Sequence, residues 1–291
     1  MASHQTYYVP AQSKWPIVGS VGLLVTVIGA GTMMNSSGQS GHLIFFTGAL
    51  IIAYMMFGWF SHVIDESRQG LYSPQMDRSF RLGMGWFIFS EVMFFAAFFG
   101  ALFYVRTLAG PWLGGAGDKV MTGELLWPNF EFAWPLMENP DPGRFQGPSE
   151  IISPWQLPLL NTIILISSSV TVTFAHHALR ANKRKALQNW LLLTVVLGVV
   201  FLGFQIAEYV HAYRDLGLTL NSGIYGATFF MLTGFHGAHV TMGALILTII
   251  LIRVYKGHFT PEQHFGFEAA AWYWHFVDVV WVGLFIFVYI F

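Results

Sequence analysis

Apolar residues form long runs along this chain, and charged residues are concentrated in the connections between the runs. An α-helix rises about 1.5 Å per residue, so about 20 apolar residues cross the ~30 Å hydrocarbon layer of a bilayer. Runs of that length cover about residues 15–34, 42–64, 82–105, 155–179, 190–213, 223–252 and 269–291. The pattern predicts an all-α, polytopic membrane protein with seven transmembrane helices.

Composition agrees with this interpretation. The chain has 291 residues, of which 55% are hydrophobic and 10% are charged, whereas about a quarter of the residues of an average soluble domain are charged. Because the apolar runs recur along the whole length, we expect residues 1–291 to form a single membrane domain. The net charge of -1 gives no basic field for nucleic acid. Cysteine is absent, which excludes thiolate-bound copper, iron–sulfur clusters and c-type haem attachment.

The placement of Lys and Arg predicts the orientation. With the N-terminus inside, the inside segments hold Lys14, Arg68, Arg78, Arg81, Arg180, Lys183, Arg184, Lys185, Arg253 and Lys256. The outside segments hold Arg106, Lys119, Arg144 and Arg214. This excess follows the positive-inside rule, and an odd number of spans puts the C-terminus outside. The long outside segment 108–154 is either an ordered cap or a partly flexible loop.

Three acids lie within the runs, where an unpaired charge costs at least about 2.5 kcal/mol. For Glu91 two interpretations stay open: a carboxylate that serves proton movement or communication with a neighbouring subunit, and a protonated acid hydrogen-bonded between helices. For Glu208 and Asp278 a structural hydrogen bond is the favoured interpretation.

Histidines raise the question of a metal site. His236, His239 and His275 fall within spans as isolated residues or as one His-x-x-His, so hydrogen bonds between packed helices are their expected role. The pair His176–His177 at the inside boundary is interpreted as an interfacial cap. A membrane di-iron enzyme needs several histidine-rich boxes at one face and a haem subunit needs facing axial histidines, so we expect no metal ligands in this chain.

The stretch from His264 to Trp281 resembles the sequence leading into the last helix of subunit III of the haem–copper cytochrome c oxidases. Further segments agree in the same order: residues 90–95, 175–179, 204–209 and 233–240. The resemblance covers all seven predicted spans and weakens in the outside segment.

The resemblance implies an accessory subunit with no haem or copper of its own, packed mainly against subunit I in a complex that also contains subunit II. It implies two helices separated from the other five by a V-shaped cleft that holds phospholipids. It also implies that the chain stabilises subunit I and supports proton uptake, with no catalysis by the isolated chain. The related quinol oxidases have a shorter subunit III that lacks the first two spans, so seven spans favour cytochrome c as the electron donor. The outside segment 108–154 is longer than in the mitochondrial versions, which indicates an oxidase of the bacterial aa3 type in a bacterial inner membrane.

Roles carry over by position. Glu91 matches the carbodiimide-sensitive intramembrane carboxylate of the family, near the interface with subunit I. Residues at positions that contact lipid head groups in similar proteins are Trp59, Glu66, Arg253, Lys256 and His258. Tyr72 stands where a histidine is common. Surface groups near the inner face, including His4 and His258, are expected to shape the local proton supply.

Two other classes of protein make different demands on the sequence. A secondary transporter that uses Glu91 and Glu208 as proton sites predicts inverted repeats or broken helices, which the sequence does not indicate. A membrane metalloenzyme predicts more interfacial histidine clusters than the sequence contains.

Overall fold

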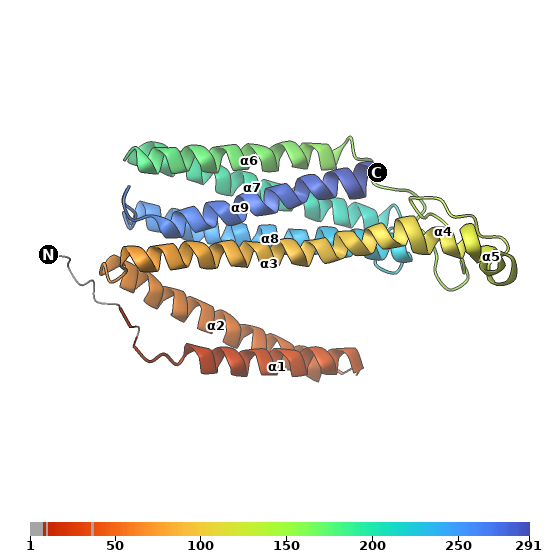
Figure 1. Ribbon diagram of the computed structural model, residues 1–291, viewed down its shortest axis with the longest axis horizontal. Coiled ribbons are helices and arrows are strands. Elements are labelled where there is room, and N and C mark those ends of the chain that lie inside the picture. Colours follow the sequence, from red (N-terminus) through yellow and green to blue (C-terminus); the bar gives the residue numbers. More distant parts are fainter. Residues whose placement is uncertain (1–7, 10, 36–37) are drawn as a thin grey trace. The chain divides into compact units, whose positions relative to one another are not determined.

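The computed structural model describes residues 8–9, 11–35 and 38–291. Its helices are α1 (Trp15–Asn35), α2 (Ser40–Arg68), α3 (Pro74–Tyr104), α4 (Gly110–Leu113), α5 (Val120–Leu126), α6 (Leu157–Arg180), α7 (Arg184–Arg214), α8 (Ile224–Tyr255) and α9 (Phe265–Leu284) (Figure 1). A π-helical turn, Val105–Ala109, joins α3 to α4, and another, Phe285–Ile290, follows α9. The described part of the chain contains no β-strand, and seven of its helical spans are long and apolar enough to cross a membrane. The predicted fold class is therefore confirmed.

The helices extend beyond the apolar runs from which they were predicted. The third span begins at Pro74, eight residues before the run, and continues through the π turn to Leu113. Ser73 precedes it, and its Oγ accepts a hydrogen bond from the backbone N–H of Met76 at 3.3 Å, as an N-cap does. An apolar run ends where the first charged residue occurs, whereas the backbone hydrogen bonds of the helix continue into the polar interface.

Contacts divide the chain into two compact units, residues 1–80 and 81–291. The first unit contains α1 and α2, an antiparallel pair whose buried positions are largely glycines. A Cβ at Gly29 would collide with the backbone of Phe45, and one at Gly48 would collide with Thr26. These glycines let the two backbones approach closely, which is how helices associate in lipid.

The second unit is a bundle of α3, α6, α7, α8 and α9 (Figure 1). Trp274 is fully buried in it, and its indole Nε1 donates to Ser168 Oγ of α6 at 2.9 Å. Gly198 of α7 and Gly243 of α8 make room for the ring, since a Cβ there would lie 2.7 and 2.8 Å from Trp274 atoms. The tryptophan therefore fixes the packing of four helices. The expectation of a single domain remains a prediction.

The outside segment 108–154 is held against the connection between α7 and α8. Asn139 Nδ2 donates to the carbonyl oxygen of Ser222 at 3.3 Å, and Ser149 Oγ donates to that of Leu216 at 2.8 Å. Leu136 and Ile152 are buried. These contacts join the segment to the connection between α7 and α8, and the cap that the sequence suggested remains a prediction.

Candidate functional site

Glu91 of α3 and His239 of α8 meet inside the bundle. Glu91 Oε2 lies 2.7 Å from His239 Nε2, and the two side chains are 22% and 15% exposed. The two residues are 148 positions apart in the sequence. This contact joins a carboxyl group and an imidazole, two side chains that can each donate or accept a hydrogen bond according to where the proton lies.

The contact of the second ring nitrogen, Nδ1, shows where His239 carries a hydrogen. Nδ1 lies 2.6 Å from the carbonyl oxygen of Phe235, and because a carbonyl oxygen only accepts, Nδ1 carries a hydrogen. The short contact on the other side then needs one proton between Nε2 and the carboxyl. That proton sits on Glu91, giving a neutral acid and a neutral imidazole, or on His239, giving an ion pair. Either state keeps the same two hydrogen bonds.

Aromatic rings enclose this pair. The ring centroid of His239 lies 4.9 Å from that of Phe95 and 5.8 Å from that of Phe94. Tyr273 of α9 stacks on the imidazole at 6.5 Å, and its hydroxyl donates to the backbone oxygen of His239 at 3.4 Å. The rings limit access of water to the shared proton.

Glu208 of α7 is placed differently. It is 1% exposed, and its Oε1 accepts a hydrogen bond of 2.6 Å from the hydroxyl of Tyr289, in the π turn after α9. Its Oε2 has no hydrogen-bond partner among the described residues. A cavity of about 150 Å³ reaches Glu208 and is lined also by Glu150, Gln156 and His211. A phenol at this site can donate to the carboxyl but takes up no proton.

The remaining intramembrane candidates connect α9 to its neighbours. His236 Nε2 donates to the carbonyl oxygen of Val277 at 3.0 Å. His275 Nδ1 lies 3.0 Å from Ser169 Oγ of α6. Asp278, on the same helix as His275, has one carboxyl oxygen, Oδ1, with no hydrogen-bond partner in the described part of the chain. Their assignment to helix packing remains a prediction, although each histidine does bridge two helices.

The candidate lipid-binding residues fall in both units. In residues 1–80, Trp59 is exposed, and Glu66 Oε2 accepts a hydrogen bond of 2.8 Å from the Tyr72 hydroxyl. Burial and this hydrogen bond raise the pKa of Tyr72. The Tyr72 hydroxyl thus binds the carboxylate of Glu66, which the resemblance assigns to a lipid head group.

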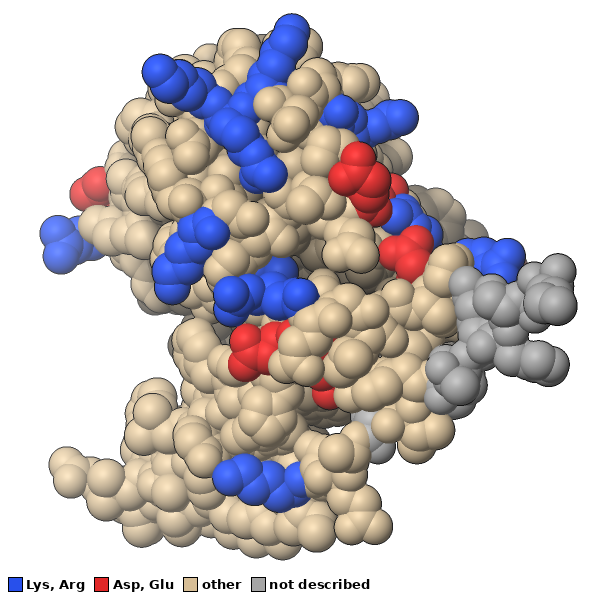
Figure 2. Space-filling view, turned by 90° about the vertical axis from the view of Figure 1, so that its left-hand side faces the viewer, with Lys and Arg blue, Asp and Glu red and all other residues tan. Residues whose placement is uncertain are grey.

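In residues 81–291, Arg253 lies in the last turn of α8, and Lys256 and His258 lie in the connection between α8 and α9. Arg253 lies over the Phe259 ring at 4.3 Å, Lys256 is exposed, and His258 is half-buried. Figure 2 shows more Lys and Arg than Asp and Glu on the face where α6 ends and α9 begins. His4 lies outside the described residues.

Several partners had no signal in the sequence. In the sequence, Tyr273 and Tyr289 resemble ordinary aromatic residues of the membrane interface or the core. Nothing there indicates that Tyr273 packs against His239 at the Glu91 site or that Tyr289 binds Glu208. Arg81 of α3 pairs with Glu268 of α9 at 2.6 Å. The positive-inside count found Arg81, but a sequence does not show which acid it meets.

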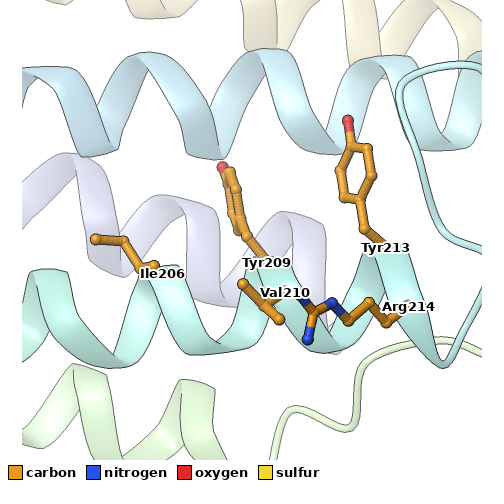
Figure 3. A pocket seen from close by; sticks show the side chains of 5 residues that line it. All are labelled: Ile206, Tyr209, Val210, Tyr213 and Arg214. Carbon is orange, nitrogen blue, oxygen red and sulfur yellow. The ribbon is translucent and has the colours of Figure 1, made fainter.

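A larger hollow lies elsewhere on α7. It measures about 320 Å³ and is lined by Ile206, Tyr209, Val210, Tyr213 and Arg214. Figure 3 shows Tyr209 and Tyr213 pointing from α7 toward α8, and the Tyr209 hydroxyl lies 2.6 Å from Thr233 Oγ1. Because one helix supplies every lining residue, this hollow is an open groove on the helix surface and contains no enclosed site.

Fold and site together define a multi-pass helical membrane protein whose spans carry acids hydrogen-bonded to imidazole and phenol. The sequence model of the family described as "Cytochrome c oxidase subunit III" matches residues 4–119 and 130–291. The chain belongs to the cytochrome c oxidase subunit III family, and the resemblance noted from its sequence is confirmed.

Curated relatives agree over nearly the full length. The chain is 42% identical to "Cytochrome c oxidase subunit 3" of Arabidopsis thaliana over 289 residues, which cover 99% of this chain and 97% of the relative. It is 38% identical to the protein of the same name from Oryctolagus cuniculus over 290 residues, covering 99% and 98%. These relatives come from a plant and an animal, and they do not support the expected bacterial origin.

Proposed function

We propose that this chain is the accessory subunit III of a cytochrome c oxidase complex, where it stabilises the redox subunit I and supports proton uptake. The observation that carries this proposal is the family match over residues 4–119 and 130–291, which leaves little of the chain for another activity. Subunit I is the proposed main partner and subunit II a further member of the complex. Haem and copper are assigned to those partners, and O2 reduction is assigned to the complex.

The Glu91–His239 pair supports the stabilising part of the proposal. It joins α3 to α8 by a 2.7 Å hydrogen bond, and both side chains keep some exposure at the surface of this unit. A neighbouring subunit that covers them would strengthen the hydrogen bond by excluding water. The shared proton can move between Glu91 and His239 without the loss of either hydrogen bond, which suits a chain beside a proton-moving enzyme.

Structural phospholipids are proposed as further ligands. Arg253 in the last turn of α8 and Lys256 directly after it are near His258 in the sequence, and anionic head groups gain about 1 kcal/mol per cation at the membrane surface. Trp59 and Glu66 are the proposed contacts in the first unit. A bacterial inner membrane is the proposed location on the length of the outside segment 108–154 alone, and the plant and animal relatives do not support it.

The test is to purify the oxidase from its membrane with and without this chain. We expect both preparations to contain the same haem and copper and to reduce O2 with electrons from cytochrome c at first. The preparation without the chain should lose activity faster during turnover and take up protons more slowly. Loss of haem or copper together with the chain, or equal lifetimes and proton uptake, would refute the proposed role.

A further inference from the structure

Three metal-ligating side chains come together where α6 ends and α9 begins. His176 lies in the last turns of α6, His264 directly precedes α9, and Glu268 is in the first turn of α9. One ligand atom of each lies within 4.8 Å of the other two. The two imidazole ring centroids are 5.4 Å apart, and all three residues are half-buried.

Each of the two histidines has a buried ring nitrogen that lacks a hydrogen-bond partner among the described residues. His176 Nε2 and His264 Nδ1 are shielded from solvent and have no hydrogen-bond partner among the residues described. Such atoms are rare in folded proteins, because desolvation without a partner is unfavourable. A metal ion bound by these two nitrogens would give each of them a partner and leave the other nitrogen of each ring to carry its proton.

The ligand atoms of this cluster favour one class of metal ion. Two imidazole nitrogens and one carboxylate oxygen suit Zn²⁺ and similar divalent transition-metal ions, with water as the fourth ligand. Bonds of about 2.0 to 2.2 Å in a tetrahedral site hold ligand atoms about 3.4 Å apart. Side-chain rotation has to close the remaining gap, and the first turn of α9 holds His264 and Glu268 together, since the backbone N–H of Glu268 donates to the carbonyl oxygen of His264 at 3.1 Å.

Arg81 supports the carboxylate of this cluster. It pairs with Glu268 Oε2 at 2.6 Å, which leaves Oε1 as the metal ligand, and carboxylates that bind metals are commonly held by such an outer hydrogen bond. The same guanidinium, together with Arg180 near His176, repels a cation. We therefore expect weaker binding than in a closed structural site with four protein ligands.

We propose that His176, His264 and Glu268 form a binding site for one divalent transition-metal ion of the zinc type. Bound metal would tie the end of α6 to the start of α9 and restrain the connection 256–264 between α8 and α9. This reverses the expectation, drawn from the sequence, that the chain has no metal ligands. It rests on the geometry of the second unit alone and does not depend on the proposed oxidase function.

The test uses the complex in which the chain is purified. Exchangeable metal is removed with a chelator, the complex is dialysed against Zn²⁺, and zinc is counted per chain by mass spectrometry. The wild type should retain one more zinc than the His176→Ala/His264→Ala variant. Each single variant should bind more than about 100-fold more weakly, because even the loss of an outer partner costs 10- to 100-fold.

His177 provides the matched control, because it is the next residue on α6 but is exposed and lies outside the cluster. The His177→Ala variant should retain the wild-type zinc. Equal zinc in the wild type and the double variant would overturn the proposal. Wild-type complex imaged by cryo-electron microscopy in Zn²⁺ gives a test without mutation: density between the three side chains is expected, and its absence would overturn the site even if a variant failed to fold.

Discussion

Two carboxylates in the same bundle have partners of different chemistry. Glu91 meets an imidazole that can accept its proton, whereas Glu208 meets the hydroxyl of Tyr289, which only donates to it near neutral pH. Glu91 is 22% exposed and Glu208 is 1% exposed. An intramembrane acid is therefore not a functional site by its position alone, since the partner decides whether a proton can be shared.

The largest effect is expected from removing the partner of Glu208. In a Tyr289→Phe variant the buried carboxyl loses its hydrogen-bond donor, so the free energy of unfolding should fall by about 1 to 3 kcal/mol. Unfolding in detergent, followed by circular dichroism, measures it. The Glu208→Leu/Tyr289→Phe double variant should recover most of the loss, because neither polar partner remains. A Tyr289→Phe variant as stable as the wild type would remove the structural role of Glu208.

A smaller effect is expected at the other carboxylate. His239→Leu leaves Glu91 without its 2.7 Å partner, but the partial exposure of Glu91 allows some solvation, so the loss should be about 1 to 2 kcal/mol. The same unfolding measurement applies. Restoration by Glu91→Leu in the His239→Leu background would assign the loss to the pair. Equal losses in single and double variants would assign it to packing.

The smallest effect is expected where a phenol–carboxylate pair lies outside the spans. Tyr72→Phe removes the hydrogen bond to Glu66 and should lower the free energy of unfolding by about 0.5 kcal/mol, the low end for a hydrogen bond. Since folding raises the Tyr72 pKa above its ordinary 10.0, its contribution is present below pH 10.0 and declines as the pH rises through the folded-state pKa. A Tyr72→Phe effect as large as that of Tyr289→Phe would mean that burial does not distinguish the two pairs.

The sequence predicted the spans because hydrocarbon selects long apolar runs irrespective of tertiary contacts. It also identified Glu91 as a candidate site residue, because placing an acid within such an apolar run is energetically unfavourable. It could not identify His239 as the partner, 148 residues away, since that depends on the packing of α3 against α8. The cluster of His176 and His264 was missed for the same reason: each histidine is unremarkable within its own segment.

The most direct test of the account compares Glu91→Gln with Glu91→Leu in the purified oxidase, with retention of the chain and the half-life of O2 reduction as the measurements. The Gln amide can donate to His239 Nε2 while His239 Nδ1 still donates to Phe235, so this variant should keep the chain and a near wild-type half-life. Leu leaves the imidazole unpaired and should shorten the half-life or release the chain. Two variants that both behave as the wild type, or a Gln variant as damaged as the Leu variant, would contradict a hydrogen-bonded Glu91–His239 pair as the stabilising element.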